Sequence, residues 1–176
     1  SAISQINCER EKIFTEKRCA GDEISSQEKE LYQIVNEYRV KNNLPQIPIS
    51  QSLSLVANRR LLDLTLNVKS LTHSWSNCAY DVNDQKTWDC VFESPKRLNS
   101  GYTGKGYENL YRTKKGNASA VLAFEGWKKS DLHNSLLLNL KTFQNIKFDA
   151  VGIAINGQYA ALWFGSGGDT KLPVKK

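Results

Sequence analysis

The sequence predicts an α+β protein, in which three or four helices pack against a small antiparallel β-sheet. Hydrophobic residues recur at helical spacing within residues 31–38, 53–64 and 121–128. Near the end of the chain, apolar residues alternate at positions 151, 153 and 155, the turn pair Asn156-Gly157 follows, and residues 159–164 return as a second strand. With 176 residues, 40% of them hydrophobic, the chain is long enough for one domain with a buried core and short for two.

The first two helices have sequence signals at both ends. Ser25 and Glu28 form a capping box, and Pro45 disfavours helical geometry at the residue before it, so this helix should span about residues 26–42. Its apolar face consists of Leu31, Ile34, Val35 and Tyr38. Ser50 begins the second helix, which should end around Asn67. The apolar face of this helix consists of Leu53, Val56, Ala57, Leu61 and Leu64.

The third helix should carry a tryptophan into the core and lead to a histidine. We expect Asn117 to cap it, and we expect Lys129 to point to water. The residues at helical spacing on its core face are Val121, Phe124 and Trp127. The helix should pause near Ser130. Either Ser130 or Asp131 would then cap a short helix that holds His133 in its first turn, at an accessible position.

Residues 75–100 lose hydrophobic periodicity and are rich in turn-forming residues, which predicts a long loop. A loop of this length in a compact domain is usually functional or disordered. Two interpretations of its aromatic residues stay open, since they could anchor the loop to the core or line a ligand groove. These residues are Tyr80, Trp88, Phe92 and Tyr102. Glycines at positions 101, 104 and 106 then predict a flexible bend that carries Glu108.

The four cysteines form two close pairs that lie far apart in the sequence. Of the three possible connectivities, the simplest is Cys8–Cys19 with Cys78–Cys90. Neither spacing matches a zinc knuckle or a redox Cys-x-x-Cys motif, so we interpret them as disulfides, which imply an oxidising compartment. The chain has no methionine and begins with Ser-Ala. We therefore expect a secreted or periplasmic protein whose signal peptide has been removed.

The net charge of +6 favours contact with acidic surfaces such as anionic lipid or glycan. The basic residues are scattered and are not interleaved with aromatic residues, so the sequence does not predict nucleic-acid binding. No apolar run approaches the roughly 20 residues needed to cross a bilayer. We expect a monomer that is not transmembrane.

Four segments carry a family resemblance in a fixed order along the chain. They are Val35-Asn36-x-x-Arg39, Tyr107-Glu108-Asn109-Leu110, Trp127-x-x-Ser130-x-x-His133 and the closing strand at residues 159–165. Together they resemble the bacterial branch of the CAP superfamily, which comprises cysteine-rich secretory proteins, antigen 5 and pathogenesis-related 1 and is built on the SCP domain. The resemblance covers roughly residues 28–165. It implies an α-β-α sandwich, with a small antiparallel sheet between helical layers and a cleft on one side.

The composition of the two ends of the chain sets the expected domain boundaries, and the resemblance sets the expected site. Residues 1–24 would be an N-terminal arm, residues 25–165 a single CAP-like domain, and residues 166–176 a flexible tail. Many eukaryotic members of the family hold two histidines and two glutamates in their cleft. His73, Glu108 and His133 match three of these four residues, and Ser130 stands at the position of the second glutamate. Tyr107 replaces the glycine that the family places directly before the first glutamate.

Three kinds of chemistry are compatible with this set of residues. His73 and His133, with a carboxylate that orients one ring, suit Zn²⁺ or another divalent cation. Ser130, His133 and Glu108 could instead act like a hydrolase triad, although no Gly-x-Ser-x-Gly motif is present and helix capping is enough to explain Ser130. In the third interpretation, the two histidines only form hydrogen bonds within a structural cleft.

The sequence and the resemblance together indicate a secreted binding or interaction module with a histidine-lined cleft. The resemblance implies a lipid, a glycan or a protein at a cell or host surface as its partner. The alternative is a metal-assisted hydrolase that acts on peptide or cell-wall amide bonds. The sequence leaves open whether the protein is catalytic.

Overall fold

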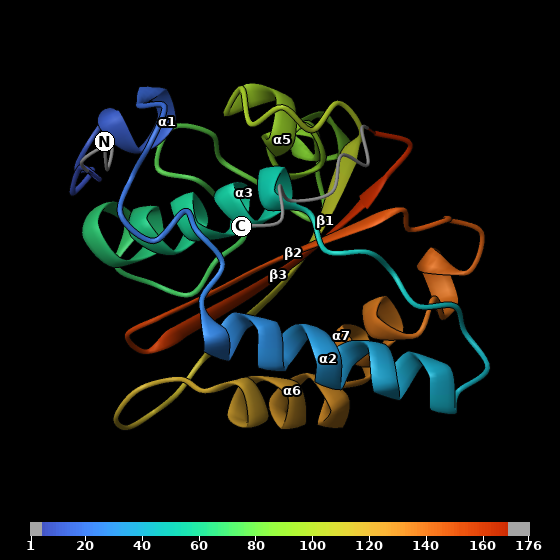
Figure 1. Ribbon diagram of the computed structural model, residues 1–176. Coiled ribbons are helices and arrows are strands. Elements are labelled where there is room, and N and C mark those ends of the chain that lie inside the picture. Colours follow the sequence, from blue (N-terminus) through green and yellow to red (C-terminus); the bar gives the residue numbers. More distant parts are fainter. Residues whose placement is uncertain (1–4, 169–176) are drawn as a thin grey trace.

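The computed structural model describes residues 5–168, and it contains a three-layer α-β-α sandwich (Figure 1). One layer consists of α2 (Ser26–Lys41), α6 (Ala120–Lys129) and α7 (Asp131–Leu137). The opposite layer contains α1 (Lys12–Thr15), α3 (Gln51–Asp63), which continues into the π-helical turn η1 (Leu64–Val68), and α5 (Ser94–Arg97). The predicted α+β class and the sandwich architecture are confirmed. Among the described residues, no helix is long and apolar enough to cross a bilayer.

The middle layer is a three-stranded antiparallel sheet with the strand order β1-β3-β2. The predicted hairpin is confirmed, as β2 (Ala150–Asn156) and β3 (Tyr159–Ser166) pair and are joined by Gly157 and Gln158. The φ of Gly157, 56°, lies in the left-handed region. Gly152 on β2 lies against the backbone of Leu53, where a Cβ atom would overlap the Leu53 carbonyl group. The small residue therefore allows α3 to pack closely on the sheet.

The third strand, β1 (Lys105–Arg112), corrects the expectation of a flexible bend around Glu108. Glu108 lies inside this strand and pairs with Trp163 of β3. The strand was missed because helices and loops cover both of its faces, so that buried residues follow one another without the two-residue alternation of a half-exposed strand. Gly106 serves packing rather than flexibility, since the Trp163 ring occupies the space where its Cβ atom would lie.

The helix caps were predicted in part. The capping box of α2 is confirmed, because the Ser25 hydroxyl accepts from the Glu28 N–H and the Glu28 carboxylate accepts from the Ser25 N–H. The cap of α6 is Ser119 and not Asn117. Val121 is 52% exposed, so it does not belong to the core face of this helix. The face is formed instead by Ala120, Ala123, Phe124 and Trp127, which follow the spacing i, i+3, i+4 and i+7.

The segment predicted as one long loop contains three short helices, namely η2 (Gln85–Thr87), α4 (Asp89–Phe92) and α5. The Asp84 side chain caps η2, and Pro95 stands at the first turn of α5. Such short helices form from local caps and from the Cys78–Cys90 disulfide without producing an amphipathic period. Tyr102 is buried in the core, in agreement with the anchoring interpretation for this residue.

The N-terminal arm packs on α3 through one buried arginine. Cys8 and Cys19 are disulfide-bonded. The Arg59 guanidinium donates to both oxygens of the Asp22 carboxylate and to the carbonyl groups of Ile13 and Glu16. At the other end of the chain, β3 extends to Ser166, while residues 169–176 of the predicted tail lie outside the described residues.

Candidate functional site

The candidate site lies at strand β1, which is an edge strand of the sheet. Neighbouring residues of a strand point to opposite faces. The Glu108 side chain therefore reaches Arg60 of α3 on one face, and the Asn109 side chain donates to the carbonyl oxygen of His133 on the other face. Consecutive residues of β1 thus link the helical layer that leads to His73 with the helix that carries His133.

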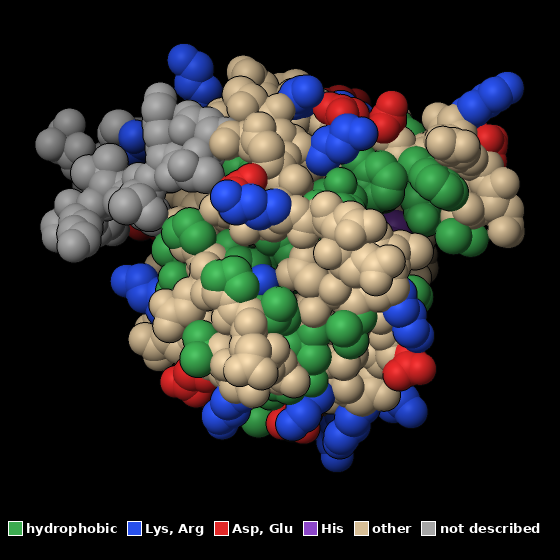
Figure 2. Space-filling view, turned by 90° about the vertical axis from the view of Figure 1, so that its right-hand side faces the viewer, with side chains coloured by type: hydrophobic (Ala, Val, Ile, Leu, Met, Phe, Trp, Pro, Cys, Tyr) green, Lys and Arg blue, Asp and Glu red, His purple; other side chains and the backbone are tan. Residues whose placement is uncertain are grey.

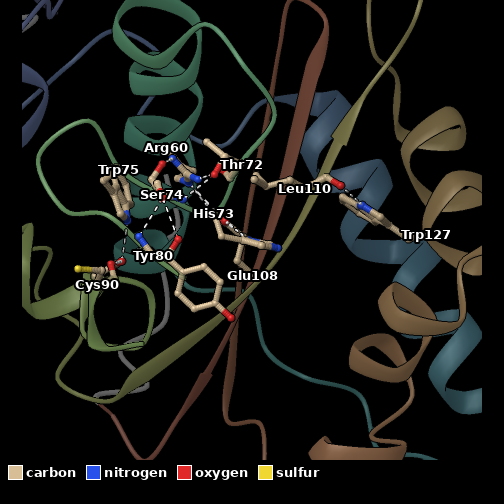
Figure 3. A network of polar contacts seen from close by, with 11 residues as sticks. Arg60, Thr72, His73, Ser74, Trp75, Tyr80, Cys90, Glu108, Leu110 and Trp127 are labelled. Carbon is tan, nitrogen blue, oxygen red and sulfur yellow. Dashed lines mark hydrogen bonds and ion pairs between the residues drawn. The ribbon is translucent and has the colours of Figure 1, made fainter. Parts of the chain in front are cut away.

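The best-defined part of the site is a chain of hydrogen-bonded groups formed by Arg60, Glu108 and His73 (Figure 3). The Arg60 Nε–H donates to the Glu108 carboxylate at 3.0 Å, and His73 Nδ1 lies 2.9 Å from Glu108 Oε1. Arg60 and Glu108 are buried, whereas 38% of the His73 side chain is exposed. The charge pair is therefore shielded from water, and the histidine that it holds faces the solvent.

The segment that carries His73 is fixed from two directions. Arg60 donates to the carbonyl groups of Thr72 and Ser74, the residues on either side of the histidine. The Ser74 hydroxyl also accepts from the Tyr80 N–H. The Tyr80 ring meets the His73 ring edge-on, with ring centroids 5.8 Å apart. Tyr80, from the disulfide-closed segment, therefore forms one wall of the site.

His133 lies in the first turn of α7, as predicted, but the expected cap of that helix does not form. Ser130 occupies the N-cap position without a side-chain capping hydrogen bond. Its hydroxyl lies instead 3.0 Å from His133 Nδ1. The imidazole competes successfully for the hydroxyl, because it stands one turn further along the same face. Ser130 therefore positions the His133 ring.

The two histidines are close enough to influence each other electrostatically. Burial lowers the pKa of the His133 imidazole from its ordinary value, and the electrostatic influence of His73 lowers it further. Both effects favour the neutral form of His133, in which one ring nitrogen carries a lone pair. A neutral ring is the form that binds a metal ion or accepts a hydrogen bond from a ligand.

The structure thus divides the four predicted site residues into two bonded pairs, His73 with Glu108 and His133 with Ser130. Within residues 5–168, the side-chain partners of the Glu108 carboxylate are Arg60 and His73, and the hydrolase-like order of Ser130, His133 and Glu108 is not formed. In the same part of the chain, no group of three or more His, Cys, Asp or Glu side chains is arranged to hold a metal ion. A metal at this site would have two imidazoles as its protein ligands, and ligands from solvent or a partner would complete its coordination.

Sequence reasoning missed the contributions of Arg60 and Asn109. Arg60 could have been noticed, because it lies at helical spacing between Ala57 and Leu64 on the apolar face of the predicted helix. A charged residue on a buried face requires a partner. No comparable local signal marked Asn109, since its contact with His133 depends on how α7 docks against β1.

Comparison with known proteins relates this arrangement to a fold found in bacterial surface and extracellular proteins. No protein-family model matches the sequence, and no curated protein matches it. Among solved structures, an extracellular protein containing a SCP domain from Bacillus anthracis is similar, with a TM-score of 0.60 and 19% identity. The match covers 80% of this chain and 40% of the Bacillus chain.

Two further structures have the same fold. An outer surface protein from Borrelia burgdorferi has a TM-score of 0.58 and 18% identity, with 82% of this chain and 95% of that chain covered. A cysteine-rich secretory protein from Staphylococcus aureus has a TM-score of 0.55 and 22% identity, with 85% and 41% covered. This chain therefore spans about two-fifths of the Bacillus and Staphylococcus proteins and nearly all of the Borrelia protein.

These findings define the chain first as an α-β-α sandwich with a histidine pair at the edge of its sheet. More particularly, the chain has the CAP fold, the fold of SCP-domain proteins. This agrees with the resemblance that the four sequence segments carry. At identities of this level the likeness concerns the fold, and the function has to be argued from the site.

Proposed function

We propose that the protein is an exported, bacterial-type CAP protein that acts as a binding module, and that its ligand contacts the pair formed by His73 and His133. The supporting observation is the hydrogen bond between His73 and the buried Glu108 carboxylate. Two of the structural neighbours are described as extracellular or secretory proteins, and both cysteine pairs form disulfides. These facts support export.

The bond to Glu108 determines which nitrogen of His73 faces a ligand. An ionised carboxylate only accepts hydrogen bonds, so Nδ1 of His73 carries the proton and donates it to Glu108. The lone pair of the neutral ring is then on Nε2, which points away from the carboxylate. Carboxylate-oriented histidines of this kind are typical of protein metal sites.

Both imidazoles therefore have a nitrogen free for a divalent cation, for which Zn²⁺ is the natural candidate. We infer that His133 Nδ1–H donates to the Ser130 hydroxyl, 3.0 Å away, which leaves Nε2 of His133 for the cation. A bound Zn²⁺ would offer its open positions to a carboxylate, a carbonyl group or an imidazole of a partner. With two protein ligands, we expect weak binding that a partner strengthens.

Exposed apolar residues lie close in sequence to the residues of the site and indicate the nature of the ligand. Leu71, Val82 and Leu132 are 50%, 63% and 70% exposed, and each lies within two residues of His73, Tyr80 or His133. Figure 2 shows hydrophobic side chains gathered next to a histidine on this face of the molecule. Exposed apolar surface around a polar centre is typical of an interaction site. A protein or lipid partner with an apolar surface fits it.

The alternative, a metal-assisted hydrolase, receives less support from the geometry. Glu108 already accepts from Arg60 and His73, so it is not free to take a proton from a water molecule. Among residues 5–168, the ring of His133 faces a serine and is hydrogen-bonded to no carboxylate. The arrangement is therefore better suited to binding than to turnover.

Calorimetric titration with Zn²⁺ tests the proposed site. Wild-type protein should bind Zn²⁺ at about pH 7.5 and much more weakly at about pH 5.5, because protonated imidazoles cannot coordinate a metal. His73→Ala and His133→Ala should each abolish the binding. Glu125→Ala, which removes a half-buried carboxylate of α6, is the control and should bind like the wild type. Binding that survives either histidine variant, or that ignores the pH change, would place the metal elsewhere.

The same variants separate a binding module from a hydrolase. Incubation with broad peptide and peptidoglycan substrates, with and without chelator, should show no turnover. Chelator-sensitive turnover that disappears in both His73→Ala and His133→Ala would favour the hydrolase.

A further inference from the structure

The Arg60 side chain makes more contacts than its role in an ion pair requires. It is fully buried, at 0% exposure, on the α3 face that meets the sheet. Its Nε–H donates to Glu108, with oxygen distances of 3.0 and 3.3 Å. Its two terminal nitrogens donate to the carbonyl groups of Thr72 and Ser74. The guanidinium also lies over the Trp75 ring, 4.9 Å from its centroid. One side chain therefore contacts both the carboxylate and the backbone that carries His73.

We propose that Arg60 is a positioning residue that determines which ring nitrogen of His73 carries the proton, and so keeps Nε2 available to a ligand. This inference rests on the proposed ligand site at His73 and His133. Arg60 touches neither the imidazole nor any ligand, so it acts through Glu108 and through the backbone of residues 72–74.

The physical reason lies in the shape of the guanidinium group. Arginine is always charged and presents its N–H groups as a rigid planar fork. The charge keeps the Glu108 carboxylate paired inside the protein, where its oxygens can only accept hydrogen bonds. The terminal N–H groups hold the backbone on both sides of His73, which fixes the distance between the ring and that carboxylate. Both ends of the bond between His73 and Glu108 are thus set by one residue.

A lysine at the same position could not do this. Its ammonium group is a compact point charge on a flexible chain, and it cannot reach the carboxylate and two backbone carbonyl groups in the same fixed geometry. Arg60→Lys keeps the buried charge but loosens the segment that carries His73. The Nδ1–H and Nε2–H tautomers should then both be populated, as in a free imidazole.

The neighbouring arginine provides a matched control. Arg59 is also buried on α3, pairs with the Asp22 carboxylate, and donates to the backbone carbonyl groups of Ile13 and Glu16. Arg59 thus forms the same kinds of hydrogen bonds as Arg60, but with the N-terminal arm instead of the segment that carries His73. Arg59→Lys should therefore cost comparable stability and leave His73 unchanged.

The test is nitrogen NMR of the His73 imidazole in metal-free protein, above its titration range, with thermal melting recorded for each variant. Wild type and Arg59→Lys should show only the Nδ1–H tautomer. Arg60→Lys should show a mixture of tautomers, and its Zn²⁺ affinity should fall about 10- to 100-fold, the usual loss when the partner of a metal-binding histidine is disturbed. The double variant Arg60→Lys with Glu108→Gln should lose less Zn²⁺ binding free energy than the two single variants lose together, because both residues act through one hydrogen bond.

A single Nδ1–H tautomer in Arg60→Lys, or the Nε2–H tautomer in the wild type, would overturn the proposal. If Arg60→Lys does not fold, the double variant Arg60→Met with Glu108→Gln removes both buried charges together, which avoids leaving one unpaired. This variant should also show mixed tautomers, and a single Nδ1–H tautomer would refute the role of Arg60. The NMR result does not depend on Zn²⁺. Suppose that Arg60→Lys shows mixed tautomers but the wild-type protein does not bind Zn²⁺. This result would support the role of Arg60 and refute the proposed function.

Discussion

Trp127 offers the most direct test of the packing that holds α6 against the sheet. Its ring is almost completely buried in the main hydrophobic core, and its Nε1–H donates to the carbonyl oxygen of Leu110 at 2.9 Å. Leu110 lies on β1, two residues from Glu108. Trp127→Ala therefore creates a cavity in the core and removes the partner of a buried carbonyl group next to the candidate site.

The size of the effect follows from these two losses. Replacement of a buried tryptophan by alanine typically costs about 3 to 5 kcal/mol, which includes the cavity. The unpaired carbonyl of Leu110 favours the upper part of this range, because a buried acceptor without a partner costs about 1 to 3 kcal/mol. A protein of this size is stable by about 5 to 15 kcal/mol in total. The melting temperature should therefore fall by about 6 to 20 °C.

Denaturant unfolding measures the free energy of unfolding of Trp127→Ala, and Trp88→Ala is a matched control. Trp88 also donates its Nε1–H to a backbone carbonyl group, that of Val82, but it is half-buried in the disulfide-closed segment. Its replacement should cost about 1 kcal/mol. Equal costs for the two variants would refute the reasoning, because burial would then not decide the stability of α6. His133→Ala should also cost little, and a cost as large as that of Trp127→Ala would make His133 a core residue.

Two other predictions concern the disulfides and the pH dependence of stability. Peptide mapping without reductant should recover Cys8–Cys19 and Cys78–Cys90 without free thiols, and each bond should contribute about 3 kcal/mol because it closes a loop of 11 or 12 residues. Free thiols or a link between Cys19 and Cys78 would contradict the pairing. The pKa of His133 is lowered in the folded state, so unfolding takes up a proton as the pH falls through about 6.5, its unfolded value. Stability should therefore be highest above about pH 6.5 and decrease below it. His133→Ala should make this decrease smaller. A pH profile that is the same in wild type and His133→Ala would show that the pKa of His133 is not lowered by folding.

The sequence was sufficient where a few neighbouring residues decide the structure. The capping box at Ser25 and the hairpin at Asn156-Gly157 are local signals, since their hydrogen bonds and dihedral angles involve residues within one turn. The two disulfides are also local, which explains why the simplest pairing was the observed one. The four segments with a family resemblance led to the CAP fold, although none of them is specific alone.

Tertiary structure decided the features that depend on residues far apart in the chain. Arg60 and Glu108 are 48 residues apart, and their bond exists only because β1 forms the edge of the sheet beside α3. The strand itself could not be predicted, because its alternation is lost when both faces are covered. The Ser130 hydroxyl likewise bonds to the His133 ring and not to a backbone N–H of α7, which depends on where that ring lies. Composition and spacing can name the groups of a site, but burial and docking determine which of them are bonded to one another.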